Sequence, residues 1–256
     1  MLLTIDIGNT QIVFGIFDED TLLTNWRFSS NTLRTEDECW AMLQSLSHAE
    51  DINLLKVRGS IISSGVPNLT KILSNMVITR LQHKPVIVNS TLNIGIKIHY
   101  DDPTTVGADR LCNAIAGFSK YGGPVIIVDF GTATTFDVIS SNGDYLGGVI
   151  ATGIETSLQA LSQRAARLMR VPLIFPEKII GTTTEASMQS GLMFGTVELI
   201  EGLVNKIKME IQGEAEVLLT GGLAPCIAKK LPDSYFLEPQ LTLLGLKIIY
   251  DRTTRA

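Results

Sequence analysis

The chain carries little charge, and its basic residues do not cluster. Only 18% of its 256 residues are charged, and 26 Asp and Glu outnumber 21 Lys and Arg for a formal net charge of −5. Binding to nucleic acid or to an anionic membrane normally requires a basic patch. We therefore expect no nucleic-acid partner and no membrane partner.

Cysteine is scarce and scattered. The three residues are Cys39, Cys112 and Cys226. Their odd number argues against a disulfide framework, and none has the C-x-x-C spacing of a zinc site. The three histidines likewise lack metal-binding spacing, so we interpret both residue types as structural.

Long apolar runs are also missing. No run approaches the roughly 20 residues of a membrane span, and the N-terminus has no cationic segment typical of a signal peptide. We therefore expect a cytoplasmic protein. A hydrophobic content of 45% is typical of a compact globular chain. This length allows one large domain or two of ordinary size.

The most informative stretch is residues 2–10, which read L-L-T-I-D-I-G-N-T. Its apolar residues predict a short buried strand, with Asp6 near the end. Gly8 permits a sharp turn, and Asn9 and Thr10 add polar groups. Backbone N–H groups at such a turn bind anions, and a neighbouring carboxylate suits a metal ion that accompanies phosphate. The alternative is a plain hairpin turn after a core strand.

A second stretch repeats this pattern about half the chain further on. Residues 125–135 read V-I-I-V-D-F-G-T-A-T-T, with Asp129 in the place of Asp6. Each loop is followed by a predicted strand, a polar turn and a returning strand. Two related halves that each offer one loop resemble the actin, sugar-kinase and heat-shock ATPase superfamily, which binds ATP between its halves.

Strands and helices alternate along the rest of the chain. Apolar spacing predicts helices over 35–46, 67–81, 153–169, 184–211, 223–231 and 241–250, with another starting near 109. Further strands are predicted at 61–62, 86–88, 216–219 and 235–237. Thr35 followed by Glu38 fits a capping box. The expected fold class is α/β, with two similar actin-like, ribonuclease H-like halves, residues 1–118 and 119–256, each a mixed sheet with flanking helices.

Two more segments carry candidate chemistry. Residues 220–222, T-G-G, follow a predicted strand, where paired glycines let a flat adenine or ribose lie against the backbone; an ordinary strand-to-helix turn is the alternative. Residues 100–110 read Y-D-D-P-T-T-V-G-A-D-R. Asp109 either caps the next helix or orients an acceptor hydroxyl near the γ-phosphate. In the second case Arg110 would neutralise an anion of the substrate.

Together these motifs resemble the type III pantothenate kinase family. They are D-I-G-N-T with Gly15 beyond it, Y-x-x-P-x-x-x-G-A-D-R, D-F-G-T-A-T-T and T-G-G, and they span nearly the whole chain. The resemblance implies ATP-dependent phosphorylation of pantothenate to 4′-phosphopantothenate, the first step of coenzyme A synthesis. It also implies Mg²⁺, a monovalent cation (K⁺ or NH₄⁺), and a homodimer.

The resemblance further implies roles for individual residues. Those expected to hold the ATP phosphates are Asp6, Ile7, Gly8, Asn9, Thr10, Gln11, Ile12 and Val13, with Asp6 near Mg²⁺. Those expected to bind the rest of the nucleotide are Thr132, Gly221 and Gly222, while Asp129 would face the monovalent cation. The expected pantothenate site consists of Tyr100, Gly107, Ala108, Asp109 and Arg110, with Asp109 as catalytic base, and is completed by Thr184 of the neighbouring subunit.

Two segments depart from the family pattern. Where the family often has G-K-N-T, residues 181–184 read G-T-T-T, which leaves open whether Thr182, Thr183 or Thr184 contacts the substrate. Where it usually has G-G-x-I-x-P-G, residues 147–153 read G-G-V-I-A-T-G, which changes the rigidity of a turn.

Small residues recur on the helix predicted from residue 184. Ser187, Gly191 and Gly195 are spaced four apart and therefore share one face. Such a face allows close approach of another backbone, from a second subunit, as we expect for a homodimer, or from the same one.

Two rival functions stay open at this point. One is another small-molecule kinase or phosphatase of the superfamily. The other is a non-catalytic regulator that only binds ATP. Retention of Asp6, Asp109 and Asp129 disfavours the second.

Overall fold

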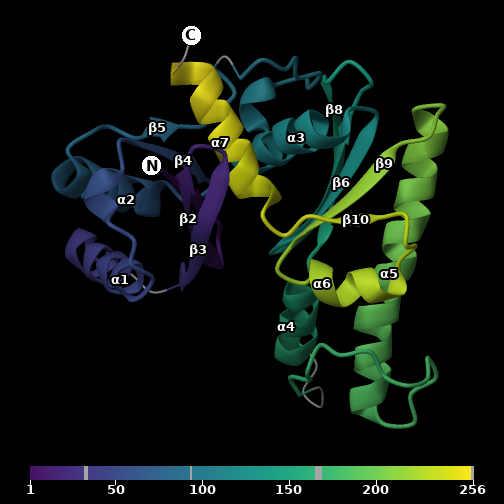
Figure 1. The fold of residues 1–256 in the computed structure, drawn as a ribbon. Coiled ribbons are helices and arrows are strands. Elements are labelled where there is room, and N and C mark those ends of the chain that lie inside the picture. The colour runs from purple at the N-terminus through teal and green to yellow at the C-terminus, as the bar shows by residue number, and fades with distance from the viewer. Residues whose placement is uncertain (32–33, 93, 165–168, 255–256) are drawn as a thin grey trace. The chain divides into compact units, whose positions relative to one another are not determined.

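The protein is described by a computed structural model that covers residues 1–31, 34–92, 94–164 and 169–254. The chain forms two compact units, one of residues 1–116 together with 241–256 and the other of residues 117–240. Each unit contains one five-stranded sheet with flanking helices (Figure 1). The repeated plan confirms the predicted α/β fold class with two similar halves.

The sheet of the first unit has the order β3-β2-β1-β4-β5. Its strands are β1 (Leu2–Ile7), β2 (Gln11–Asp18), β3 (Thr21–Ser29), β4 (Gly59–Ser64) and β5 (Val86–Ile87). β1 pairs antiparallel with β2 and parallel with β4, so Asp6 lies between Val13 and Ser63. Side chains alternate between the two faces of a sheet, which separates Asp6 from the apolar residues on either side of it in β1.

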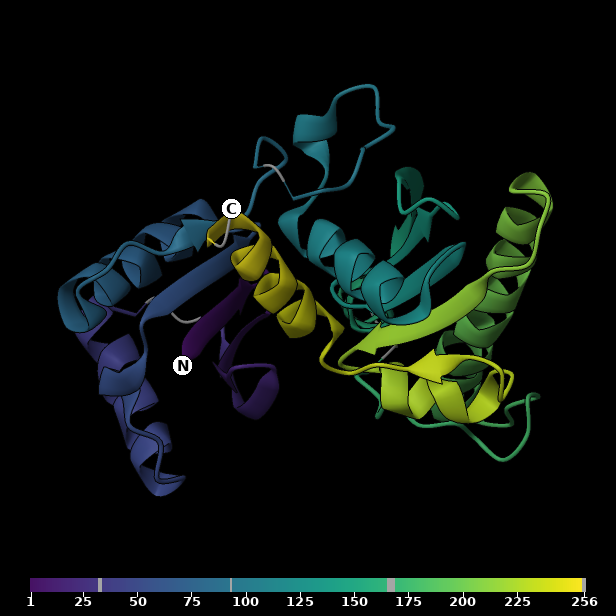
Figure 2. The ribbon, with the colours of Figure 1, turned by 45° about the horizontal axis from the view of Figure 1, so that its top comes forward.

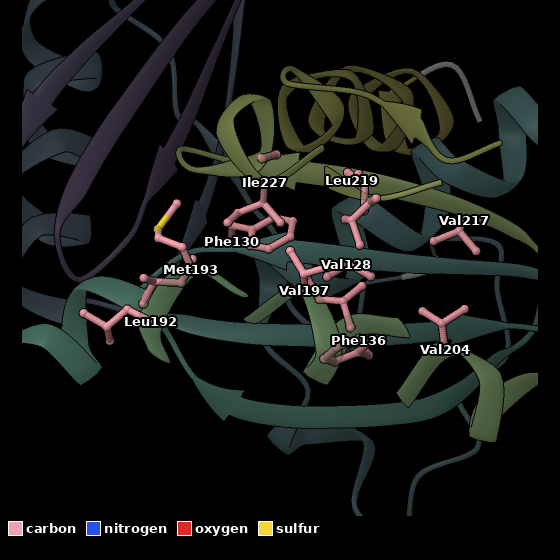
Figure 3. Close-up of a cluster of buried hydrophobic side chains, with 14 of the residues drawn as sticks. Val128, Phe130, Phe136, Leu192, Met193, Val197, Val204, Val217, Leu219 and Ile227 are labelled. Atoms are coloured by element: carbon pink, nitrogen blue, oxygen red, sulfur yellow. The ribbon is translucent and has the colours of Figure 1, made fainter. Parts of the chain in front are cut away.

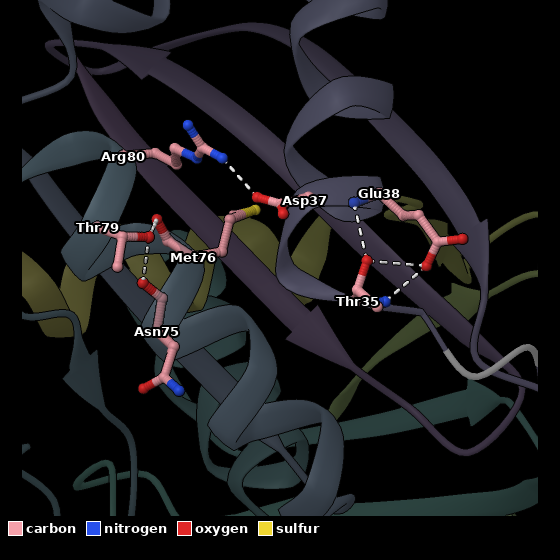
Figure 4. A network of polar contacts seen from close by, with 7 residues as sticks. All are labelled: Thr35, Asp37, Glu38, Asn75, Met76, Thr79 and Arg80. Carbon is pink, nitrogen blue, oxygen red and sulfur yellow. Dashed lines mark hydrogen bonds and ion pairs between the residues drawn. The ribbon is translucent and has the colours of Figure 1, made fainter.

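Helices α1 (Glu36–Ala49) and α2 (Pro67–Leu81) pack against the apolar face of this sheet. Thr35 and Glu38 form the predicted capping box: Thr35 Oγ1 accepts from the Glu38 N–H at 3.2 Å, and the Glu38 carboxylate accepts from the Thr35 N–H at 2.7 Å (Figure 4). Arg80 of α2 pairs with Asp37 of α1 in the same view. The two helices are thereby joined at their surface as well as through the core.

The last helix, α7 (Leu241–Thr254), packs on the other face of the same sheet. Glycines make room for it: a Cβ on Gly59 would lie 1.8 Å from the Tyr250 hydroxyl, and one on Gly245 would lie 2.0 Å from the Cys112 carbonyl oxygen. Our sequence analysis assigned residues 241–256 to the second half, whereas the structure groups them with the first. The sequence pattern predicts that this helix exists, but not which sheet it covers.

A buried ammonium group anchors α7 to the β2–β3 turn. Lys247 pairs with Asp20 and, one helical turn on, with Asp251. Burial alone would lower the pKa of Lys247, but its hydrogen bonds to the two carboxylates outweigh burial and raise that pKa. Lys247 therefore remains charged in the folded protein.

The sheet of the second unit has the order β10-β9-β6-β7-β8. Its strands are β6 (Val125–Phe130), β7 (Ala133–Ile139), β8 (Tyr145–Thr152), β9 (Glu216–Gly221) and β10 (Phe236–Leu237). β6 pairs antiparallel with β7 and parallel with β9, as β1 pairs with β2 and β4. Asp129 consequently occupies the position in this sheet that Asp6 occupies in the first.

Helices α4 (Ile154–Arg164), α5 (Thr184–Glu210) and α6 (Ala224–Ile227) pack on one face of the second sheet around the cluster drawn in Figure 3. Phe130, Phe136 and Met193 lie at its centre and are almost fully buried. The end of α3 (Ala108–Tyr121) packs on the other face through Gly117. In Figure 2, α6 and β10 lie beside β9.

In the described part of the chain, three short 3₁₀ turns complete the fold: η1 (Leu54–Lys56), η2 (Pro103–Thr105) and η3 (Ala228–Lys230). The helix predicted over 223–231 is thus divided into α6 and η3. The helix predicted over 153–169 is observed to Arg164, and residues 165–168 lie outside the described part of the chain. All three cysteines are free thiols that are buried or half-buried, as expected. Among the described residues, no helix has the length and apolarity needed to cross a membrane.

Candidate active site

The first predicted phosphate loop joins β1 to β2 as a tight hairpin. The Gly8 N–H donates to the Gln11 carbonyl at 2.9 Å, and the Gly8 carbonyl accepts from Ser30 Oγ at 2.7 Å. The Ser30 N–H donates to the Thr10 carbonyl at 2.9 Å. The loop is therefore fixed from its outer side by the end of β3. Among the other loop residues, Asn9 is exposed, Asp6 and Val13 are half-buried, and Ile7 and Ile12 are buried.

Asp6 and Asp109, the two acidic residues of the first unit that we expect in the site, lie near the thiol of Cys112. Burial raises the pKa of Cys112 well above its ordinary value, the negative charges of Asp6 and then Asp109 raise it further, and a contact with Ser63 partly offsets the rise. Both carboxylates are therefore within electrostatic reach of one buried sulfur. The residue expected near Mg²⁺ and the residue expected to orient the acceptor thus both act on the same buried group of the first unit.

Asp109 is the second residue of α3, and Gly107 is the residue just before this helix. Asp109 is exposed, and its Oδ1 accepts from the N–H of Arg110 at 2.9 Å. A Cβ on Gly107 would lie 2.5 Å from that oxygen, so the absence of a side chain there leaves room for the carboxylate. Asp109 accordingly lies inside the first turn of α3 rather than at the position before it, and its carboxylate accepts a hydrogen bond from a backbone N–H of that turn.

The remaining residues of the predicted acceptor site differ in exposure. Arg110 is only 7% exposed, Ala108 is buried, and Tyr100 lies at the surface with 36% exposure. A planar guanidinium binds a carboxylate through two parallel hydrogen bonds. Arg110 is thus chemically suited to an anionic acceptor.

The second predicted loop, between β6 and β7, is held by the start of α4. The carbonyl of Thr132 accepts from Thr156 Oγ1 at 2.7 Å and from the Gly153 N–H at 3.2 Å. A Cβ on Gly153 would lie 2.4 Å from the same carbonyl oxygen. The side chain of Thr132 is exposed. The loop is therefore packed from behind and open on its outer side.

Asp129 and Gly221 are in contact at the carboxyl ends of β6 and β9. Gly221 has φ of +92°, and a Cβ there would lie 2.5 Å from Asp129 Oδ1 and 2.6 Å from the Phe130 carbonyl oxygen. A side chain at this position is excluded by both the backbone angle and the space. The T-G-G turn, whose Gly222 is exposed, is thereby placed directly beside the carboxylate of the second loop.

Thr184 is the first residue of α5, and Thr183 caps that helix. Thr183 Oγ1 accepts from the Ala186 N–H at 3.1 Å. All three threonines, 182–184, are exposed. The Thr183 oxygen is engaged in capping, whereas Thr184 is the first residue of the helix itself.

The donor set of the first loop fits a magnesium ion that is bound mainly through phosphate. Among the residues that the structure describes, no three acidic, His or Cys side chains gather into a metal-binding group. Mg²⁺ in nucleotide sites usually takes one or two carboxylates, and phosphate oxygens and water supply the rest. Asp6, half-buried at the end of β1 beside an exposed polar loop, suits that limited role.

Three residues that adjoin this site were not identified from the sequence: Ser30, Ser63 and Cys112. Ser30 reaches Gly8 across 22 positions of sequence. The signal available for Ser63 was a polar residue at the end of an apolar strand, as for Asp6. Cys112 carried no signal beyond its place one turn after Asp109.

Comparison with solved structures identifies the class of fold. The chain superposes on a ROK hexokinase from Thermus thermophilus with a TM-score of 0.54 at 12% identity, covering 100% of this chain and 99% of that one. A Baf family transcriptional activator from Campylobacter jejuni gives a TM-score of 0.60 at 19% identity, covering 99% and 98%. Similarities at such identities show the fold alone, which is that of the actin-like ATPases and sugar kinases.

Sequence comparison then narrows the class to one family. The family model for type III pantothenate kinase matches residues 2–206. The type III pantothenate kinase of Moorella thermoacetica is 44% identical over 254 residues, which cover 99% of this chain and 100% of that protein. The chain belongs to the type III pantothenate kinase family.

Proposed function

We propose that this chain transfers the γ-phosphoryl group of ATP to the terminal hydroxyl of pantothenate, producing 4′-phosphopantothenate for coenzyme A synthesis in the cytoplasm. The observation that carries the proposal is the presence in one unit of Asp6, at the end of β1 beside the hairpin, and of the exposed Asp109 at the start of α3. One carboxylate beside a phosphate-type hairpin and a second at a helix start are the two acidic groups that phosphoryl transfer to an alcohol requires.

The residues of the first unit divide the work in this proposal. The amides and polar side chains of residues 8–11 bind phosphate oxygens, and Asp6 helps to hold Mg²⁺, which neutralises charge on the phosphates when bound. Asp109 accepts a hydrogen bond from the acceptor hydroxyl and aims it. Arg110 binds the carboxylate of pantothenate. Positioning and charge neutralisation then supply most of the rate enhancement.

The residues of the second unit bind the nucleotide and a monovalent cation in this proposal. Thr132 contacts the nucleotide from its exposed loop. Gly221 and Gly222 let the adenosine lie against the backbone. Asp129 faces K⁺ or NH₄⁺.

A panel of acceptor alcohols tests the proposed activity. Purified protein is incubated with ATP, Mg²⁺ and K⁺ together with pantothenate, glucose, N-acetylmannosamine, glycerol or acetate, and ADP release is measured. We expect turnover with pantothenate alone. Turnover with a sugar or acetate instead would assign another kinase activity, and ATP binding without any turnover would favour the regulator.

We also propose a homodimer in which α5 forms part of the interface and Thr184 reaches the acceptor site of the partner. The support is the exposed small-residue face of α5: a Cβ on Gly191 or Gly195 would meet nothing within 4 Å among the described residues. Close packing within the same subunit therefore does not explain these glycines. A second subunit packed against them would.

Replacing Gly191 with Leu distinguishes a monomer, in which this face of α5 is exposed, from the proposed dimer, in which a partner covers it. In a monomer the change should raise the melting temperature, because Leu is the better helix former by about 0.5–1 kcal/mol. In the proposed dimer the side chain meets the partner backbone, so we expect dissociation or a lower melting temperature in light scattering and calorimetry. Gly213→Leu is the control, since this exposed glycine follows α5 and has only the Ile211 carbonyl nearby, at 3.9 Å. An intact dimer with raised stability would place the interface elsewhere.

A further inference from the structure

Ser63 carries a buried hydroxyl with no evident structural use. The residue lies next to last in β4 and is 0% exposed. Among the described residues, no well-formed hydrogen bond reaches its Oγ. The Cys112 thiol lies beside it, but a thiol is only a weak partner for a hydroxyl. Buried polar groups are nearly always satisfied, and an exception calls for an explanation.

The neighbouring buried hydroxyls show the usual behaviour. Ser60, three residues earlier in the same strand, is 1% exposed, and its Oγ lies 2.8 Å from His83 Nε2. Thr4 of β1 is fully buried and donates to the Gly15 carbonyl at 3.2 Å. Ser63 therefore differs from these two, although it lies in the same sheet.

The position of Ser63 points to the group that it serves. Ser63 and Asp6 are register partners in the parallel β1–β4 ladder, so their side chains leave the sheet on the same face. The ladder continues beyond them, because the Gly65 N–H donates to the Ile7 carbonyl at 3.2 Å. The two side chains are thus held next to each other by backbone hydrogen bonds on both sides.

We propose that Ser63 is a positioning residue of the nucleotide site, and that its O–H donates a hydrogen bond to the Asp6 carboxylate when Mg²⁺ and ATP are bound. This inference rests on the proposed function. Carboxylates that bind a metal are usually held by a hydrogen bond to a second group. Hydrogen bonds to an ionised acceptor are about twice as strong as those between neutral groups.

The test compares Ser63→Ala with Ser60→Ala. Affinity for the non-hydrolysable analogue adenylyl imidodiphosphate is measured by calorimetry with and without Mg²⁺, together with the melting temperature. For Ser63→Ala we expect an unchanged or raised melting temperature, because an unsatisfied hydroxyl is removed. We expect its Mg²⁺-dependent affinity to fall by about 10–100-fold, the usual effect of removing a group that supports a metal ligand. Binding without Mg²⁺ should not change.

Ser60→Ala should give the opposite result, with a lower melting temperature and normal Mg²⁺-dependent affinity, because its hydroxyl supports His83. Mg²⁺-dependent affinity of Ser63→Ala within about twofold of the wild type would overturn the inference. So would a loss no larger than that of Ser60→Ala. Failure of the wild type itself to bind the analogue would instead overturn the proposed function, so the two failures are distinguishable.

Discussion

Replacing Asp109 with Asn is expected to lower kcat by about 10²–10⁴-fold while leaving ATP affinity unchanged. An alcohol has a pKa far above that of a carboxyl group, so the carboxylate does not deprotonate the acceptor beforehand. In a loose transition state the proton leaves late, and the carboxylate mainly aims the hydroxyl and then takes its proton. Asparagine keeps the shape of the side chain but cannot accept that proton.

The structural alternative predicts a different result for the same variant. Asp109 lies in the first turn of α3, where a negative charge interacts favourably with the helix dipole. Loss of that interaction costs about 0.3–1 kcal/mol of stability, and it should not affect turnover. Asn keeps an Oδ1 that can accept from the Arg110 N–H, so this hydrogen bond is retained. A large loss of kcat with a nearly unchanged melting temperature therefore indicates catalysis.

Asp102→Asn is the matched control. Asp102 lies in the same loop, where its Oδ1 accepts from the Thr104 N–H at 2.9 Å and from the Thr104 hydroxyl at 2.6 Å. These hydrogen bonds lower the pKa of Asp102. Asn retains a carbonyl oxygen for both bonds, so we expect kcat within a few-fold of the wild type. An Asp109→Asn enzyme as active as this control would leave Asp109 with a role at the helix start only.

Features set by local sequence were predictable. The Thr35–Glu38 capping box was predicted and is observed, and α2 has the predicted bounds, Pro67–Leu81. Proline at a first turn and a polar N-cap act within a few residues, so the sequence pattern contains the whole interaction. The echo between the two loops was equally visible, because each loop directly follows its strand.

Features set by distant contacts were not predictable in the same way. The placement of α7 depends on clearances at Gly59 and Gly245, which lie far apart in the sequence. The role that we propose for the buried hydroxyl of Ser63 follows only from the β1–β4 register, which brings Ser63 beside Asp6. Likewise, the need for glycine at Gly221 follows from its approach to Asp129 across two strands. The sequence pattern indicates these residues individually, whereas their contacts depend on the assembled sheets.

Removing K⁺ and NH₄⁺ is expected to lower the rate by on the order of 10²-fold, the usual effect of losing one charge-stabilising group from an active site. The carboxylate of Asp129 is half-buried at the end of β6. Gly221 has no side chain to crowd the Asp129 carboxylate, whose Oδ1 would lie 2.5 Å from a Cβ at that position. Carboxylate and carbonyl oxygens are the ligands that K⁺ prefers.

The measurement is a titration of KCl or NH₄Cl into enzyme kept in Tris buffer, with choline chloride holding the ionic strength constant. We expect activity to rise from a low baseline and to saturate in the wild type. Asp129→Asn should lose the response, because the neutral amide no longer supplies a negative charge to the cation. Equal wild-type activity with and without the two cations would contradict the assignment of a monovalent cation to Asp129. A saturating response that persists in Asp129→Asn would show that another group of the site binds the cation.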